Sequence, residues 1–137
     1  MFSEEIGIIY LILFILTILV GLYYSYDSII NTKNWLAKYG VDESGAALSR
    51  FAGSQILGVT LVGTYILFKG ATGMWLYFAV AFVINTCCTL TGLYTIFGSD
   101  LGKKEGVKYT NELWIVPGIL AIITAVIIYG IQDIIYT

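Results

Sequence analysis

The chain has 137 residues, of which 58% are hydrophobic and only 12% are charged, and its formal net charge is −2. This composition excludes an ordinary water-soluble domain, which carries about 25% charged residues and could not hide so much apolar surface at this size. The seven basic residues are scattered, so the concentrated basic face that a nucleic-acid partner requires is absent. We therefore expect one domain, residues 1–137, with membrane lipid around it.

Four long apolar runs follow one another along the chain, at about residues 6–26, 47–68, 74–97 and 113–133. Each is long enough for one helical crossing of a bilayer core of about 30 Å, which takes roughly 20 residues. The runs are continuous and do not alternate, which favours helices over barrel strands. Short links make neighbouring helices antiparallel. The sequence therefore predicts an all-α integral membrane fold, an antiparallel four-helix bundle that runs up-down-up-down.

The link after the first run contains a shorter helical pattern. Residues 28–39 place four side chains on one face, and Gly40 suits the position just after a helix end. We expect a short interfacial helix on the membrane surface, with Asp42 or Ser44 capping the second span. The shared face consists of Ile29, Thr32, Leu36 and Tyr39.

The distribution of basic residues predicts the orientation in the membrane. Six of the seven lie in or beside the loops 27–45 and 100–112, and the seventh, Lys69, lies in the tight link between the second and third runs. Basic loops stay on the cytoplasmic side. We expect a multi-pass protein of the cytoplasmic (inner) membrane, with both long loops inside and both termini outside. The N-terminal segment lacks the basic region of a signal peptide, so the first run should stay as an anchor.

Small residues predict where the helices touch, because membrane helices associate by close packing and not by burying apolar surface. They recur on the second, third and fourth runs, whereas the first is bulkier. We expect the second, third and fourth helices to pack tightly together and the first to be more exposed to lipid. The predicted packing positions are Gly53, Gly58, Ala81, Thr89, Gly92, Gly118, Ala121 and Ala125.

Arg50 is a candidate binding residue at the cytoplasmic start of the second span. Charged groups near lipid are costly, which makes them functional candidates. One interpretation is that Arg50 snorkels to the interface and fixes the orientation. The other is that it binds a carboxylate or phosphate headgroup, or pairs with Asp27 or Glu112.

Asn85 is a second candidate, near the middle of the third span. Its amide needs a partner such as Gln55, Thr60, Tyr65 or a backbone carbonyl. An interhelical hydrogen bond, worth about 0.6 kcal/mol, is one interpretation. A ligand pocket formed by Asn85, Gln55 and Thr89 is the alternative.

Residues for catalysis are missing from the sequence. Histidine is absent, and Cys87 and Cys88 are adjacent within an apolar run, without CxxC spacing. No glycine-rich phosphate loop, no GxSxG motif and no carboxylate at mid-span is present. We expect no enzyme activity, no metal and no cofactor.

Two segments resemble the corresponding part of small DoxX-like membrane proteins. They are Trp-Leu-Ala-Lys-Tyr-Gly-Val-Asp at 35–42 and Ala-Leu-Ser-Arg-Phe-Ala-Gly-Ser-Gln-Ile-Leu-Gly at 47–58. Arg50, Gly53 and Gly58 match that family's Arg-x-x-Gly start of the second span and its later glycine. The resemblance implies four spans. It also implies a membrane subunit, because a few members associate with quinone-linked oxidoreductases.

The leading expectation is a non-catalytic accessory or structural subunit of a larger membrane protein complex. One alternative is a lipid- or quinone-binding membrane protein, in which Arg50 lies beside a polar pocket around Gln55 and Asn85. A small-solute transporter is the other alternative.

Overall fold

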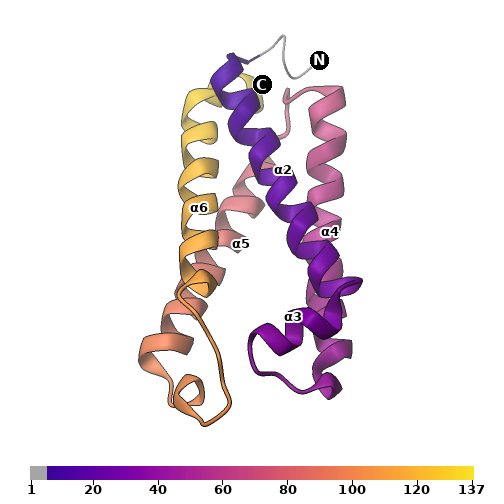
Figure 1. Cartoon of the computed structure of the whole chain (residues 1–137). Coiled ribbons are helices and arrows are strands. Elements are labelled where there is room, and N and C mark those ends of the chain that lie inside the picture. Colours follow the sequence, from indigo (N-terminus) through magenta and orange to yellow (C-terminus); the bar gives the residue numbers. More distant parts are fainter. Residues whose placement is uncertain (1–5) are drawn as a thin grey trace.

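The structure, a computed structural model, describes residues 6–137, and within that range every regular element is helical (Figure 1). The expectation about the N-terminal segment concerns residues 1–5, which lie outside the described residues. Four segments are long and apolar enough to cross a membrane: Ile8–Ile29, Glu43–Lys69, Trp75–Gly98 and Glu112–Gly130. The prediction of an all-α chain with four membrane-length helices is therefore confirmed.

The four spans are built on four long helices, with shorter helical elements between them. The long helices are α2 (Ile8–Ile29), α4 (Ala46–Lys69), α5 (Trp75–Leu93) and α6 (Glu112–Gly130). The short elements are α3 (Thr32–Lys38), the turns η1 (Glu43–Gly45) and η3 (Leu101–Lys103), the π-helical turn η2 (Tyr94–Gly98), and α7 (Gln132–Ile135).

Helix α2 continues past the end that the sequence predicts, through Asp27 to Ile29. Its last polar residues fit inside the helix because their hydroxyls donate to carbonyls of the preceding turn, as Ser28 Oγ does to the Tyr24 carbonyl at 2.6 Å. The short helix of this link, α3, is consequently shorter than predicted and begins at Thr32. The Asp42 carboxylate accepts from the Ser44 amide at 2.9 Å and caps the turn that leads into α4, as expected.

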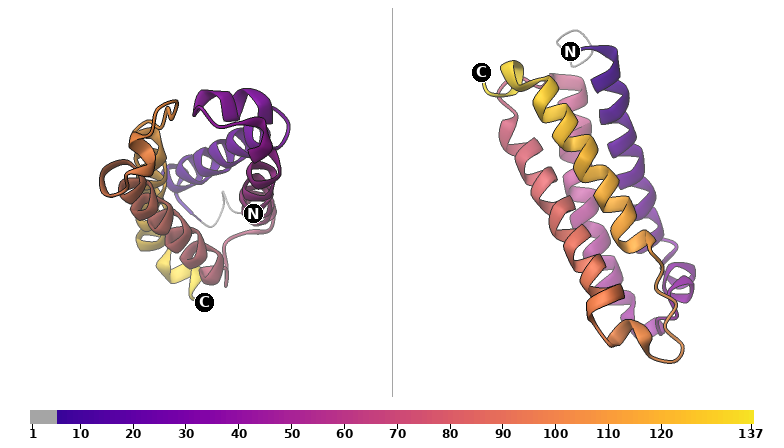
Figure 2. Two further views of the ribbon diagram at one scale, coloured as in Figure 1. Left: turned by 90° about the horizontal axis from the view of Figure 1, so that it is seen from below. Right: turned by 90° about the vertical axis from the view of Figure 1, so that its left-hand side faces the viewer.

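The long helices pack as two pairs, α2 along α4 and α5 along α6 (Figure 2). Helices α4 and α5 make few contacts with each other, although only residues 70–74 join them. The expectation that the second, third and fourth helices pack tightly together is therefore right for the third and fourth, α5 and α6, but wrong for the second, α4, which packs on α2. Helix α2 packs closely on α4 because Gly21 lies directly against Thr60, and Gly53 lies directly against Ser28.

A solid apolar core fills the end of the molecule at which α2 begins and α6 ends. Phe14, Ile66, Phe78, Ile127 and Ile135 come from five different helices and are fully buried there. At the opposite end the two helix pairs diverge, and the two long loops lie beside them (Figure 1). A cavity lies between the helices on the loop side of this core.

Candidate functional site

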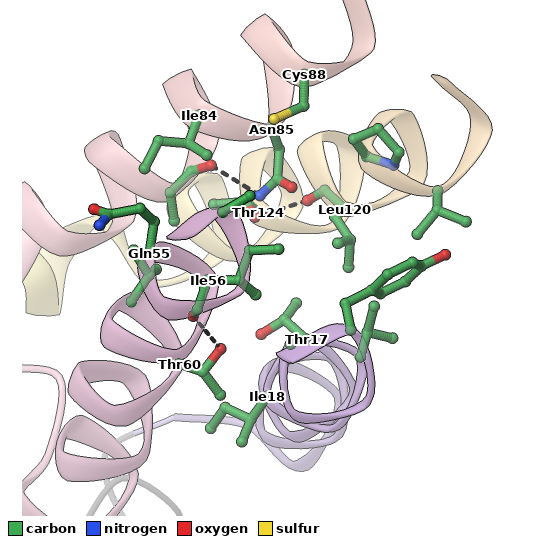
Figure 3. Close-up of a pocket in the computed structure, with 18 of the residues that line it drawn as sticks. Thr17, Ile18, Gln55, Ile56, Thr60, Ile84, Asn85, Cys88, Leu120 and Thr124 are labelled. Carbon is green, nitrogen blue, oxygen red and sulfur yellow. Dashed lines mark hydrogen bonds between the residues drawn. The ribbon is translucent and has the colours of Figure 1, made fainter. Parts of the chain in front are cut away.

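A cavity of about 610 Å³ lies between the four long helices, on the loop side of the core (Figure 3). Its volume falls within the range of about 300–1,000 Å³ that is typical of small-molecule sites. Most of its wall is aliphatic or aromatic, and a few polar side chains interrupt it. The polar or charged residues in the wall are Thr17, Tyr24, Tyr39, Gln55, Thr60, Tyr77, Asn85, Glu112 and Thr124.

The cavity is closed at its inner end and polar at its outer end. Phe14, Phe78 and Ile127 belong both to its wall and to the buried core, so they form its floor. Tyr24 and Glu112 line it at the loop end. Ten positions of α2 separate Phe14 from Tyr24, which at 1.5 Å per residue gives a depth of about 15 Å.

Five residues contact one another at the loop end, and we call them the mouth cluster: Tyr24, Trp35, Lys38, Tyr39 and Glu112, of which all but Lys38 line the cavity. Tyr24 Oη donates to Glu112 Oε1 at 2.6 Å, and Lys38 Nζ donates to Glu112 Oε2 at 2.7 Å. The Lys38 ammonium also lies 5.4 Å from the Trp35 ring centroid and 5.3 Å from that of Tyr39. Both carboxylate oxygens are thus engaged, and the charge at the mouth is balanced.

Hydrogen bonding and burial shift the pKa values of two loop residues in the mouth cluster. The hydrogen bond from Lys38 to Glu112 raises the pKa of the Lys38 ammonium above 10.5. Burial raises the pKa of the Tyr39 phenol above 10.0. At neutral pH Lys38 is therefore charged and Tyr39 is neutral.

The two long loops are tied together beside the mouth cluster. The Lys108 amide donates to the Tyr39 carbonyl at 3.0 Å. Gly40 has φ +67°, and a side chain on it would collide with the Gly106 carbonyl. Only glycine satisfies both the backbone conformation and the close approach at this position. The sequence signals for this contact lie in two separate loops, which is why pattern reading does not pair them.

The polar groups in the wall are mostly bonded to their own helices. The hydroxyls of Thr17, Thr60 and Thr124 donate to the carbonyls of Phe14, Ile56 and Leu120 at 2.7, 2.8 and 2.7 Å. Asn85 Nδ2 donates to the Ala81 carbonyl at 2.9 Å (Figure 3). Of the partners considered for Asn85 from the sequence, the structure therefore selects a backbone carbonyl.

The structure brings Gln55 and Asn85 into one cavity wall but leaves Arg50 and Thr89 out of it. Arg50 is exposed, and its Nε lies 3.4 Å from the Ile29 carbonyl. It does not pair with Glu112, whose oxygens are taken by Tyr24 and Lys38. The expectation from the sequence that Arg50 lies beside a polar pocket around Gln55 and Asn85 is therefore wrong, because Arg50 does not line the cavity.

The glycines among the predicted packing positions lie in different surroundings. A Cβ on Gly53 would lie 2.6 Å from Ser28 Cβ, so α4 approaches α2 closely there, and a Cβ on Gly92 would lie 2.7 Å from the Leu113 carbonyl carbon, so α5 approaches α6 closely. A Cβ on Gly118 would make ordinary contact with Thr89 Cγ2 at 3.6 Å, and one on Gly58 would meet nothing within 4 Å.

The predicted alanines divide in a similar way. Ala81 lines the cavity, Ala121 lines an outer groove of α5 and α6, and Ala125 is exposed.

Sequence reasoning missed the mouth cluster and three close helix approaches. The sequence offers Glu112 only as a partner for Arg50 and does not single out Tyr24. The missed approaches are Gly21 against Thr60, Gly63 against Tyr77, and Gly130 against Tyr10. The sequence holds one signal for the mouth cluster: Glu112 is an acid at the start of an apolar run, and Lys38 lies in a loop that is expected on the same side of the membrane.

Other chemistry finds little support in residues 6–137. No group of three or more histidine, cysteine or acidic side chains in this range is placed to hold a metal ion. Cys87 and Cys88 are free and exposed. Comparison with protein families, with curated proteins and with solved structures finds no match to this chain. The resemblance of residues 35–58 to DoxX-like proteins therefore stays a prediction.

Proposed function

We propose that this chain is a multi-pass membrane protein whose four spans form an up-down-up-down bundle that binds an amphipathic, lipid-like molecule in its cavity. The observation that carries this proposal is a cavity of about 610 Å³ with apolar walls, a closed floor and a polar mouth. Apolar walls suit an acyl or isoprenoid tail, and the mouth cluster suits a polar head. The proposed role is binding without catalysis.

The closed floor favours a binding protein over the alternative of a small-solute transporter. Phe78 and Ile127 are 1% exposed and Ile135 is 0% exposed. They lie in the packed end of the bundle, so a solute in the cavity has no path through that end. A binding protein needs only the open end.

The proposed orientation places both long loops in the cytoplasm and both termini outside, in the cytoplasmic (inner) membrane. Its support is that the basic loops 27–45 and 100–112 lie at one end of the molecule, joined by the hydrogen bond from the Lys108 amide to the Tyr39 carbonyl. Lys69 lies at the end of α4, beside the short link to α5. Six basic residues against one satisfy the positive-inside rule.

The test fills the cavity and asks whether a bound molecule is lost. Ala81→Phe places a ring in the cavity wall, whereas Ala125→Phe places the same ring on the exposed face of α6. Native mass spectrometry after mild detergent extraction should show a lipid adduct on the parent and on Ala125→Phe, and at least tenfold less on Ala81→Phe. An adduct that survives equally in Ala81→Phe, or a parent that never carries one, overturns the proposal.

A second candidate, the accessory subunit of a larger complex, has one observation in its favour. A shallow apolar groove of about 500 Å³ runs along α5 and α6 on a different face from the cavity. Thr89, Gly118 and Ala121 line it, so the backbones beneath are accessible to another helix. Blue-native electrophoresis of the extracted protein tests this candidate, and a lone 15.1 kDa species in every mild detergent counts against it.

A further inference from the structure

Three threonine hydroxyls in the cavity wall have no hydrogen left to donate to a ligand. A threonine hydroxyl has one hydrogen, and Thr17, Thr60 and Thr124 each give theirs to a carbonyl of their own helix. Only oxygen lone pairs remain on these three side chains. A ligand that presents only acceptors would find no donor at these positions.

Asn85 adds a stronger acceptor to the same wall. The Ala81 carbonyl can only accept, so the amide atom that lies 2.9 Å from it must be the nitrogen. The Asn85 carbonyl oxygen Oδ1 is then left for another donor, and no protein donor to it is found among residues 6–137. In Figure 3 Asn85 lies among the lining residues, with its nitrogen bonded to the preceding turn.

We propose that the cavity selects a lipid that carries a hydroxyl group, and that this hydroxyl donates its hydrogen to Asn85 Oδ1. Gln55 also lies in the wall, but it is exposed, and in Figure 3 its amide points away from Asn85. A hydroxyl both donates and accepts, whereas a quinone or another carbonyl compound only accepts. This inference rests on the proposed lipid-binding function and specifies its ligand class.

The experiment offers three probes with matched tails in equal amounts: 1-hexadecanol, its methyl ether and 2-heptadecanone. Native mass spectrometry of the full chain in mild detergent measures the ratio of the three adducts. We expect the alcohol adduct to exceed each of the others about tenfold, the ratio that one hydrogen bond commonly provides. In Asn85→Leu this ratio should fall towards one.

A matched control comes from the same helix. Thr86 also bonds to its own helix, through Oγ1 to the Phe82 carbonyl at 2.8 Å, but it lies outside the cavity wall. Thr86→Val should therefore keep the full preference for the alcohol. A preference that persists in Asn85→Leu overturns the role of Asn85, and equal binding of all three probes, or a preference for the ketone, overturns hydroxyl selection.

The outcomes distinguish the hydroxyl preference from the proposed lipid-binding function on which it rests. Equal binding of the three probes to the parent, lost in Ala81→Phe, leaves lipid binding intact and removes only the hydroxyl preference. Absence of every probe from the parent overturns both.

Discussion

Lys38 and Glu112 are 74 residues apart in the sequence, yet Lys38 Nζ lies 2.7 Å from Glu112 Oε2. This ion pair joins the short helix α3 to the first residue of α6. Tyr24 of α2 donates to the other oxygen of the same carboxylate. Three separate elements therefore meet at one carboxylate, at the opening of the cavity.

We expect Glu112→Gln to destabilise the folded protein by up to about 1 kcal/mol, because the ion pair with Lys38 is partly exposed and partly screened by solvent. The side chains of Lys38 and Glu112 are 41% and 26% exposed. Glu43→Gln is the matched control, since Glu43 pairs with Lys33 at 3.0 Å with side chains that are 69% and 80% exposed. Its effect on the free energy of unfolding should be close to zero. Denaturant titration in detergent measures both, and equal effects would contradict the special position of Glu112.

The raised pKa of Lys38 predicts how the contribution of Lys38 to the stability of the fold depends on pH. A group whose pKa is higher in the folded protein than in the unfolded chain stabilises the fold fully below its unfolded pKa. That contribution disappears as the pH rises through the folded pKa, here above 10.5. The difference in stability between the parent and Lys38→Met should therefore be constant from pH 7 to about 9 and shrink above pH 10.5. A difference that already changes between pH 7 and 9 would show that another group titrates there.

Gly21→Ala should destabilise the contact between α2 and α4 by about 1–3 kcal/mol, the usual range for overpacking. The new Cβ would lie 3.2 Å from Thr60 Cγ2 and would also collide with the Thr60 hydroxyl. Gly58→Ala adds the same methyl group in open space on α4 and should be neutral or stabilise slightly, by less than about 1 kcal/mol. Thermal unfolding of the two variants in one detergent compares them, and equal midpoints would contradict the close packing at Gly21.

Phe78→Ala should be costly because it removes a ring from the floor of the cavity. Such truncations cost about 3–5 kcal/mol, and the lower end applies here because lipid solvates the ring in the unfolded state as well. Phe78 is 1% exposed, whereas Phe82, one turn further along α5, is 37% exposed and serves as the control. Phe82→Ala should change the free energy of unfolding by less than half as much. Comparable losses in both variants would argue against a packed floor.

The orientation can be tested with single cysteines in a Cys87→Ser, Cys88→Ser background. Lys33→Cys and Lys103→Cys should be shielded from a membrane-impermeant thiol reagent in intact cells, and Lys69→Cys should react. The reason is that the loops 27–45 and 100–112 share an end and carry most of the basic residues. Labelling of Lys33→Cys and Lys103→Cys from opposite sides would overturn the proposed topology.

The sequence predicts the four long helices because uncharged runs of membrane length have few other structures available. It does not predict which helices pair. That choice depends on where a glycine on one helix meets a side chain on another, as Gly21 meets Thr60, and such a match is not visible within one run. Gly58 looks like a packing residue by its spacing alone, yet a Cβ added to it would meet nothing within 4 Å.

Only the amide residues in the cavity wall could be predicted from the sequence as members of the candidate site. Gln55 and Asn85 are identifiable because amides are rare in apolar spans and need partners. The mouth is not identifiable in this way, since Lys38 and Glu112 belong to segments that the sequence leaves unconnected. Contacts that form only in the fold, such as the hydrogen bond from the Lys108 amide to the Tyr39 carbonyl, bring those segments together.

The closed floor at Phe14 and Phe78 also determines how far into the bilayer a bound molecule can reach. A depth of about 15 Å from Phe14 to Tyr24 equals half of a hydrocarbon core of about 30 Å. In the orientation that we propose, the occupant would come from the inner leaflet, with its head level with its neighbours. The protein would then sample one leaflet of the membrane and leave the other untouched.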